Sequence, residues 1–394
     1  MLTRRSSLNP DLTLPIMNFS LSLTHPARPV VDRARTRLAR TLALLAALSL
    51  TCALAAPAHA DDTPQTVRIA VVAYSNAGKT QYAGASALVA SDGWLEKSLA
   101  ERHIKLEWVP ESVAAVGTLV NEAFTSHSID FAGYGDLPSI VINASGTPTR
   151  LIVPGGVGSN TYLVVPADST AKSIVDLKGK RIALNRGRPW EVTFAKLIAA
   201  NGLKLSDFKI YNLDPQAGAA AVSAGRVDAF FTLADAYALE DKHVGKIIWS
   251  TKDAPPSWKM RAELWASDDF VRAHPDVTQL VASAYVRAAY WISQPQNRDA
   301  YIKLLSASGQ PESIVRRELD DEKLPWKDQW TPVFSPALSA HYRDVSAYGE
   351  ESHLTSTKVD VDTLLTPRFV DAALKELKLD HYWAADGDPH VASR

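Results

Sequence analysis

The stretch from Lys180 to Asn201 reads K-R-I-A-L-N-R-G-R-P-W-E-V-T-F-A-K-L-I-A-A-N and predicts a strand that feeds a helix through a tight turn. The run 181–184 is short and apolar, which is typical of a buried strand. Gly187 can take a positive φ in the turn, and Pro189 suits the first position of a helix, where its missing N–H costs nothing. Apolar side chains then recur at helical spacing until Asn201-Gly202, which is expected to end the helix.

Two arginines, Arg186 and Arg188, lie in this turn. The first N–H groups of a helix have no partner in the helix and carry about half a positive charge. Together with the arginines they would suit an oxyanion. An ordinary surface turn with solvated arginines accounts for the same residues equally well, so the stretch alone leaves both interpretations open.

Strand and helix patterns alternate along two runs of the chain, near 67–154 and 181–249. Such alternation is typical of parallel sheets covered by helices. We therefore predict two α/β lobes. Beyond a strand near 263–267 the pattern turns helical, with apolar positions in register from 277 to 292.

The N-terminal segment has the features of a signal peptide rather than of a folded domain. Arginines between residues 33 and 40 precede an uncharged stretch from 41 to 56, and Ala58-His59-Ala60 matches the small-x-small pattern of a cleavage site. We predict that residues 1–60 are a signal peptide cleaved after Ala60. Met17 is an alternative start, because the region before Arg33 is unusually long.

Charge and cysteine content restrict the function classes. Residues 1–60 contain seven arginines and two aspartates, so cleavage would change the formal net charge from −1 to −6. This balance does not suggest binding to nucleic acid or to an anionic membrane. The single cysteine, Cys52, lies inside the predicted signal, so the mature chain would have no disulfide and no thiolate site. Export without disulfides is compatible with a bacterial periplasm.

Motifs of common enzyme classes are missing from the sequence. Ala77-Gly78-Lys79-Thr80 is similar to part of a nucleotide-binding loop, but the position that needs the first glycine is Ala73. No G-x-S-x-G motif occurs, and the histidines are scattered rather than paired at metal-binding spacing. We expect no catalytic residue, no metal and no cofactor.

Several segments in collinear order resemble a known family. They are V-R-I-A-V-V-A-Y (67–74), A-L-V-A-S-D-G-W-L-E-K-S-L (87–99), S-I-D-F-A-G-Y-G-D-L-P-S-I (128–140), S-I-V-D-L-K-G-K-R-I-A-L (173–184), A-G-R-V-D-A-F-F-T-L-A-D-A-Y (224–237) and F-V-R-A-H-P-D-V-T-Q-L-V (270–281). This order is similar to that of periplasmic solute-binding proteins of the nitrate/taurine/alkanesulfonate ABC-transporter family, and most similar to the aliphatic-sulfonate-binding proteins. The resemblance covers nearly the whole mature chain.

The resemblance implies a type II periplasmic binding protein, with two α/β lobes joined by a two-crossing hinge and with extra C-terminal helices. The domains would be 61–160 plus 256–385 for lobe 1 and 161–255 for lobe 2, followed by a disordered tail, 386–394. The hinge crossings would lie near Ser159–Leu163 and Glu263–Ala266. The segment 324–330 could then overhang the cleft.

By the same resemblance, loops facing the cleft would bind the anionic head of the ligand. The implied ligand-binding residues are Ser75, Asn76, Gly135, Asp136, Asn160, Thr161, Arg188, Trp190 and Asp235. Family members often carry small hydroxyl residues where this chain has Arg186–Trp190. An arginine there could bind a sulfonate bidentately, and Trp190 could wall off an organic tail.

We therefore expect a periplasmic, monomeric, non-enzymatic protein that delivers an alkanesulfonate or taurine to the permease subunits of an ABC importer. Nitrate or another small anion is the alternative ligand. A pyrimidine-synthase-like enzyme on the same fold is the alternative function, and it would require a reactive histidine or cysteine in the cleft.

Overall fold

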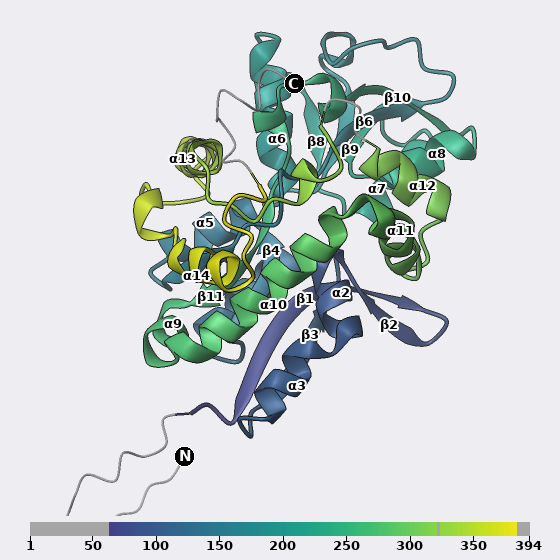
Figure 1. The fold of residues 1–394 in the computed structure, drawn as a ribbon. Coiled ribbons are helices and arrows are strands. Elements are labelled where there is room, and N and C mark those ends of the chain that lie inside the picture. Colours follow the sequence, from purple (N-terminus) through teal and green to yellow (C-terminus); the bar gives the residue numbers. More distant parts are fainter. Residues whose placement is uncertain (1–62, 321–323, 384–394) are drawn as a thin grey trace, which may run out of the picture. The chain divides into compact units, whose positions relative to one another are not determined.

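The computed structural model describes residues 63–320 and 324–383 (Figure 1). The predicted signal peptide, the alternative start at Met17 and the predicted tail from 386 lie outside these residues. Within the described ranges, no helix combines the length and the apolar character that a membrane span requires.

The first lobe is built on a six-stranded sheet. Its strands are β1 (Thr66–Asn76), β2 (Lys79–Tyr82), β3 (Lys105–Glu111), β4 (Phe131–Gly135), β5 (Thr149–Val153) and β11 (Ala262–Ser267). Their order is β2-β1-β4-β11-β5. β2 pairs with the end of β1, at 73–76, and β3 pairs with the earlier part of β1, at 66–72. β1 runs parallel to β3 and β4, whereas β11 is antiparallel to both of its neighbours. The alternation of strands and helices had indicated a parallel sheet, which holds for β1, β3 and β4; β11 departs from it, because the chain returns from the second lobe and enters this sheet from its opposite end.

Helices cover both faces of the first sheet. They are α2 (Gly84–Asp92), α3 (Trp94–Ala100), α4 (Val116–Thr125), α5 (Asp136–Ala144), α9 (Asp268–Ala273), α10 (Pro275–Ser293), α13 (Pro336–Glu351) and α14 (Arg368–Glu376). Alternate residues of β1 enter different cores: Ile69 packs with residues of α2, α3 and α10, whereas Ala70 packs with residues of α4, α5 and α13. This follows from the two-residue period of a strand.

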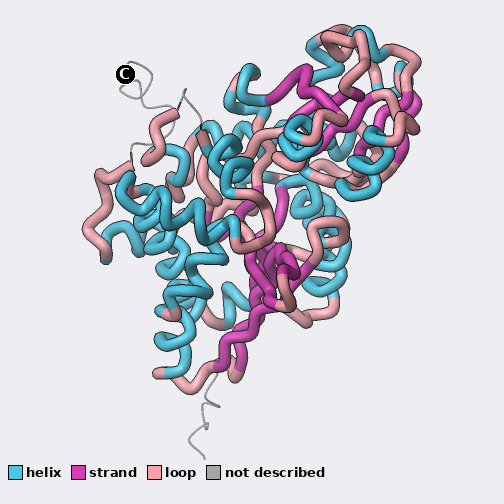
Figure 2. The backbone as a smooth tube through the Cα atoms, turned by 90° about the vertical axis from the view of Figure 1, so that its right-hand side faces the viewer, coloured by secondary structure: helices cyan, strands magenta, loops and turns pink. Residues whose placement is uncertain are grey.

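The second lobe contains a five-stranded sheet of order β10-β6-β9-β7-β8. Its elements are β6 (Tyr162–Pro166), β7 (Arg181–Leu184), β8 (Lys209–Tyr211), β9 (Ala229–Thr232), β10 (Gly245–Ser250), α6 (Pro189–Ala200), α7 (Pro215–Ser223) and α8 (Ala236–Asp241). β7 is parallel to β8 and β9, whereas β6 is antiparallel to β9 and β10. Figure 2 shows the strands of the two lobes as separate groups, each with helices around it. The prediction of two α/β lobes is confirmed.

The chain crosses between the two sheets at 154–161 and again at 251–261. The second crossing includes two short 3-10 helices, η3 (Thr251–Asp253) and η4 (Pro256–Trp258). An isolated bridge between Ser159 and Met260 joins the two crossings. The second crossing was predicted near Glu263–Ala266 and ends directly before these residues, which are themselves part of β11, where the apolar run Leu264–Ala266 is buried between β4 and β5.

Of two C-terminal helices, α11 (Arg298–Ser306) packs on the first lobe as expected, whereas α12 (Glu312–Leu319) departs from the expected division into lobes. The whole of 256–385 was expected in lobe 1, but Ile314 of α12 is buried among residues of β6, β9 and α8 in the second lobe. α12 is apolar on this side, and the second sheet offers it a matching apolar face. The other proposed domain boundaries stay predictions.

Candidate functional site

The predicted turn and helix of the opening stretch are present. β7 ends at Leu184, Gly187 has φ +72°, and Pro189 occupies the first position of α6. Arg188 is the N-cap residue, with extended backbone and no side-chain cap. This placement brings the Arg188 side chain to the positive end of the helix, where an anion is favoured.

Arg188 is a buried cation with few protein partners. Its side chain is 7% exposed, its Nη2 donates to the carbonyl oxygen of Val113 at 2.8 Å, and its guanidinium carbon lies 5.2 Å from the centre of the Trp190 ring. Its Nε has no hydrogen-bond partner among the described residues. Burial lowers the pKa of Arg188 to about 10, so the guanidinium remains charged at neutral pH.

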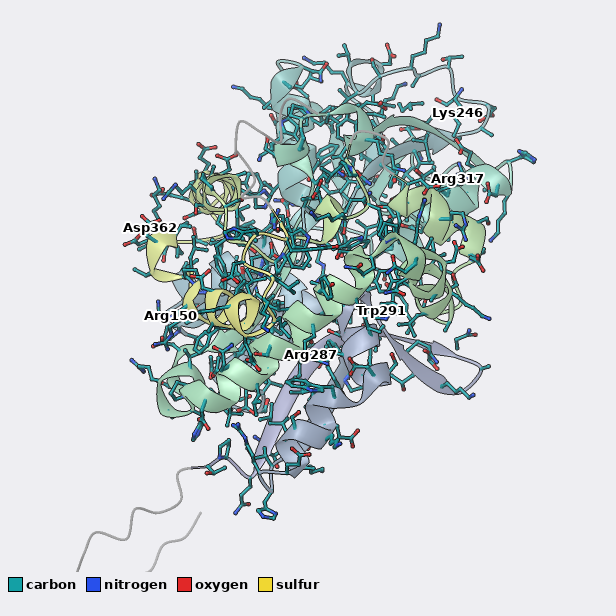
Figure 3. All side chains as sticks on the ribbon, in the orientation of Figure 1. Arg150, Lys246, Arg287, Trp291, Arg317 and Asp362 are labelled. Carbon is teal, nitrogen blue, oxygen red and sulfur yellow. The ribbon has the colours of Figure 1, made fainter. Side chains whose placement is uncertain are left out.

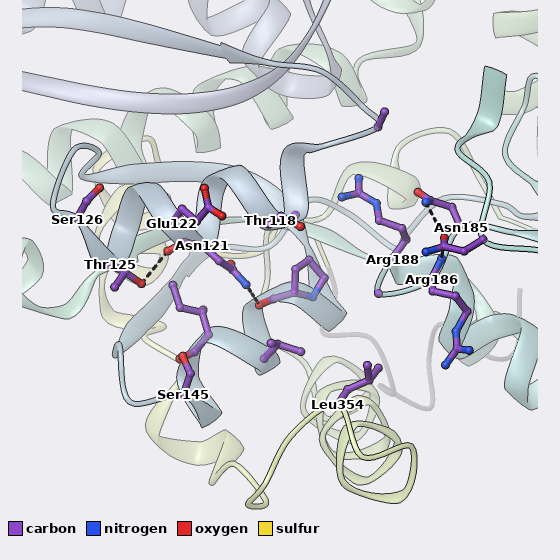
Figure 4. A pocket seen from close by; sticks show the side chains of 17 residues that line it. Thr118, Asn121, Glu122, Thr125, Ser126, Ser145, Asn185, Arg186, Arg188 and Leu354 are labelled. Atoms are coloured by element: carbon purple, nitrogen blue, oxygen red, sulfur yellow. Dashed lines mark hydrogen bonds between the residues drawn. The ribbon is translucent and has the colours of Figure 1, made fainter. Parts of the chain in front are cut away.

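A cavity of about 840 Å³ lies beside this arginine, between α4, α5 and the turn 185–188 (Figure 4). Both lobes contribute to its wall. It is lined by Ala114, Gly117, Thr118, Asn121, Glu122, Thr125, Ser126, Pro138, Val141, Ile142, Ser145, Asn185, Arg186, Gly187, Arg188, Asn212 and Leu354. The cavity therefore combines a cationic end with hydroxyl, amide and aliphatic walls.

The neighbouring arginine, Arg186, is already neutralised. Its Nε donates to the carboxylate of Glu191, which is buried at 1% exposure. The same carboxylate accepts the Gly187 N–H and the Tyr348 hydroxyl, the latter at 2.8 Å. Of the two arginines in the turn, Arg188 is thus the one available to an external anion.

Two glycines of the first lobe allow this turn to approach closely. A Cβ on Gly135 would lie 2.1 Å from Pro189 Cγ, and a Cβ on Gly117 would lie 2.6 Å from Arg188 Nη1. Both distances are far below a normal contact. The N-terminus of α5 and the N-terminus of α6 therefore meet across the lobes at Gly135 and Pro189.

Asp136, next to Gly135, is fully buried and held by protein groups. It accepts the Arg261 N–H at 3.0 Å and lies 2.7 Å from Nε2 of His341. These contacts tie α5 to the second crossing and to α13. The structure thus places Asp136 in the interior of the first lobe rather than in the cavity wall.

Trp190 is also placed away from the cavity. Its side chain is 2% exposed and packs in the core of the second lobe with Phe194 and Leu197. A residue that follows the helix-initiating proline by one position can face either the cleft or the core, and its large apolar surface is buried in the core here.

Asn160 and Thr161 lie in the first crossing and are occupied by protein partners. The N–H and Nδ2 of Asn160 donate to Glu318 Oε1 at 3.2 and 3.3 Å, and its Oδ1 accepts from Thr251 Oγ1 at 3.1 Å. The Thr161 N–H donates to Thr251 Oγ1 at 2.9 Å. These two residues connect the two crossings with α12.

The remaining predicted residues are Ser75, Asn76 and Asp235. The first two end β1 in a hairpin with β2. Nδ2 of Asn76 donates to the carbonyl of Ala307 at 3.0 Å. Asp235 accepts from Thr232 Oγ1 at 2.8 Å, and burial raises its pKa to about 6.

Of the nine residues predicted to bind the ligand, only Arg188 lines this cavity. The residues that were missed include Thr118, Asn121 and Thr125, which form a polar stripe on α4. Their spacing of three and four residues, opposite the apolar positions of that helix, was a signal present in the sequence.

The segment 324–330 does not overhang the cavity. Trp326 Nε1 donates to the carbonyl of Ile292 at 2.7 Å, and Trp326 and Trp330 pack at the edge of the first-lobe core, 5.1 Å apart between ring centres. Both indoles are therefore held against the first-lobe core, which includes α10, where their apolar surface is partly buried. Within the described ranges no cluster of three or more histidine, cysteine, aspartate or glutamate residues could hold a metal ion.

Comparison with known proteins gives a consistent set of relatives. The profile of the family described as NMT1/THI5 like matches residues 104–298. A periplasmic sulfonate-binding protein SsuA from Methylobacillus flagellatus KT is 49% identical, with a TM-score of 0.76 over 82% of this chain and 98% of that protein. The taurine-binding periplasmic protein of Escherichia coli (strain K12) is 25% identical over 64% of this chain and 81% of its own length.

The fold is also shared with an enzyme. The desulfurization enzyme DszB is 17% identical, with a TM-score of 0.59 over 79% of this chain and 99% of the enzyme. This likeness shows the fold alone. The family profile and the 49%-identical SsuA relative together show the family. This chain belongs to the NMT1/THI5-like family, and the relatives to which it is similar include periplasmic binding proteins.

Proposed function

We propose that this protein is the substrate-binding component of an ABC importer and that it captures a small organic anion, an alkanesulfonate or taurine, in the cavity between its lobes. Arg188 carries the proposal. It is a charged guanidinium, nine-tenths buried, with an unpartnered Nε beside the positive end of α6. A buried charge without a counter-charge is costly, and a bound sulfonate would supply that counter-charge together with hydrogen-bond acceptors.

The size and lining of the cavity favour an organic anion over nitrate. A volume of about 840 Å³ falls in the range of sites that hold organic ligands. Pro138, Val141, Ile142 and Leu354 offer an aliphatic wall for a hydrocarbon tail. Nitrate has no tail, so it would leave this wall unused.

The likeness to periplasmic binding proteins and the N-terminal pattern support export to the periplasm, with cleavage after Ala60. Delivery to permease subunits would follow from closure of the lobes around the ligand, because ligand contacts from both lobes exist only in the closed state. We propose that the protein acts as a monomer.

An enzyme on this fold is the second class of function. Attack on a substrate in the cavity would require a nucleophile or a general base there. The described residues that line the cavity include neither histidine nor cysteine, and the one carboxylate among them, Glu122, is solvent-exposed. This composition supports binding without chemistry.

Calorimetric titration of the purified protein with propanesulfonate, taurine and nitrate tests the proposal. A charge-assisted hydrogen bond contributes about 1.5–3 kcal/mol, so Arg188→Ala should weaken sulfonate binding by about 10- to 150-fold. Arg226→Ala, which removes an exposed charge from the same lobe, is the matched control and should bind as the wild type does. Equal affinity in a correctly folded Arg188→Ala protein would remove the assignment, and turnover of the sulfonate would favour the enzyme.

A further inference from the structure

We infer that α12 is mechanically part of the second lobe, that the chain therefore passes between the lobes both before α12, at 307–311, and after it, and that Glu318 is the positioning residue that holds α12 against the first crossing. This inference does not depend on the identity of the ligand. It starts from the adjacent helices α11 and α12, which lie side by side in Figure 1 but contribute to the cores of different lobes.

α12 packs against the second lobe. Ile314 is 2% exposed and belongs to the same buried cluster as Tyr162, Val164 and Phe230. These three residues come from β6 and β9 in the second sheet. Burying an isoleucine side chain stabilises a contact by about 1.5–3 kcal/mol, so this packing is a substantial anchor.

Two partly exposed ion pairs also join the same helix to α8, each contributing about 0–1 kcal/mol beside the buried packing. Arg317, labelled in Figure 3, donates to Glu240 at 2.6 Å and to Asp241 at 2.8 Å. Its guanidinium carbon also lies 4.0 Å from the centre of the Tyr237 ring. Three residues of α8 therefore contact one side chain of α12.

Glu318 extends this anchor to the first crossing. Its carboxylate accepts from the backbone N–H and Nδ2 of Asn160 and from the hydroxyl of Tyr162, which in turn accepts from Tyr237 at 3.0 Å. Lys252, in the second crossing, donates to the carbonyl oxygens of Arg317 and Asp320 at the end of α12. One helix thus contacts both segments that join the lobes.

α11 belongs instead to the first lobe. Tyr301 is buried in the first-lobe core, with Leu304 and Leu305 packed at its edge. Directly after the helix, the carbonyl of Ala307 accepts from Asn76 in the β1–β2 hairpin. Gly309 then has φ +98°, which only glycine adopts without strain.

The ion pairs that connect α12 with α11 and its flank are on the surface. Arg316 pairs with Asp299 at 2.8 Å, and Arg298 pairs with Asp320. Exposed pairs contribute about 0–1 kcal/mol, less than the buried packing and hydrogen bonds on the other side. Rotation of the lobes should therefore be taken up by the chain before and after α12, with 307–311 on the N-terminal side, and should leave α12 on the second lobe.

Hydrogen–deuterium exchange on the ligand-free protein tests this assignment. Glu318→Ala leaves the Asn160 N–H and the Tyr162 hydroxyl buried without their acceptor, so α12 and the segment 160–162 should exchange at least about tenfold faster. α11 and the first-lobe core should keep their protection. Glu318→Gln retains an acceptor oxygen and should restore most of the protection of α12.

Arg316→Ala is the control on the same helix, because its partners Asp299 and Glu312 are exposed, and it should leave exchange in α12 near the wild-type rate. Equal loss of protection in α11 and α12 would show that the two helices form one unit on the first lobe. No change in either helix would show that Glu318 does not hold α12. Either result overturns the inference.

Discussion

The close contact between Gly135 and Pro189 predicts that one added methyl group, in Gly135→Ala, should hold the lobes apart. Gly135 has φ −78° and ψ 162°, a backbone conformation that alanine adopts without strain. A Cβ there would lie 2.1 Å from Pro189 Cγ and 3.1 Å from Pro189 Cδ. A normal carbon–carbon contact is about 3.5–4.0 Å, so α5 and α6 would have to separate by roughly 1.5 Å at this point.

The penalty should fall on the closed state rather than on folding. Overpacking of this size costs about 1–3 kcal/mol, and opening of the lobes relieves it without disturbing either core. In Gly135→Ala, we expect propanesulfonate to bind about 5- to 150-fold more weakly, while the thermal unfolding midpoint stays near that of the wild type. Small-angle scattering should show a larger radius of gyration than in the wild type.

Gly133→Ala is a matched control on the same strand, β4. Its added Cβ would have Ser86 Oγ as nearest neighbour, at 3.6 Å, which is an ordinary contact inside the first lobe. This variant should keep the wild-type affinity and radius. The reasoning is refuted if Gly135→Ala has an unchanged radius and affinity, or if the clash appears instead as lost thermal stability with binding intact.

Two further outcomes follow from the structure and a third from the sequence. Trp190→Ala should lower the free energy of unfolding by about 3–5 kcal/mol in urea titration, because the indole fills the second-lobe core; a loss below 1 kcal/mol would contradict its buried position. Burial raises the pKa of Asp235 from 3.8 to about 6, so between these pH values the folded state binds a proton that the unfolded state does not. The free energy of unfolding should therefore fall as pH rises from about 4 to 6. Asp235→Asn should flatten this dependence in denaturation curves recorded across that range. N-terminal sequencing of the protein recovered from the periplasm should read Asp-Asp-Thr-Pro, the residues that follow Ala60, and an intact leader would contradict the predicted cleavage.

Local chemistry was predictable from the sequence. The apolar run 181–184, a glycine in the turn and a proline at the helix start led to the strand, the positive φ of Gly187 and the position of Pro189 in α6. The alternation of strands with helices led to two α/β lobes. These features depend on backbone preferences and on hydrophobic periodicity over a few neighbouring residues, so a short window of the sequence is enough to predict them.

The position of Arg188 was predictable for the same reason, since an N-cap residue points where the helix N–H groups point. The burial and the hydrogen bonding of its guanidinium were decided by the tertiary structure. Only the approach of Gly117 and Val113 from the first lobe, about 70 residues earlier in the chain, buries the guanidinium and leaves its Nε without a partner. Arg186, two residues away, is neutralised by Glu191 and the hydroxyl of Tyr348 behind it.

The same contrast holds for Asp136, Asn160 and Trp190: the sequence predicted their local positions, and the tertiary structure decided their partners. Each lies in a loop or first helical turn at the expected place, yet each is directed to a partner from a distant segment: His341, Glu318 and the second-lobe core. α12 joins the second lobe although its neighbours in the chain do not. Residue type and spacing determine which groups a segment offers, but the partner that satisfies a buried charge or covers an apolar face comes from whichever element folding brings within contact distance.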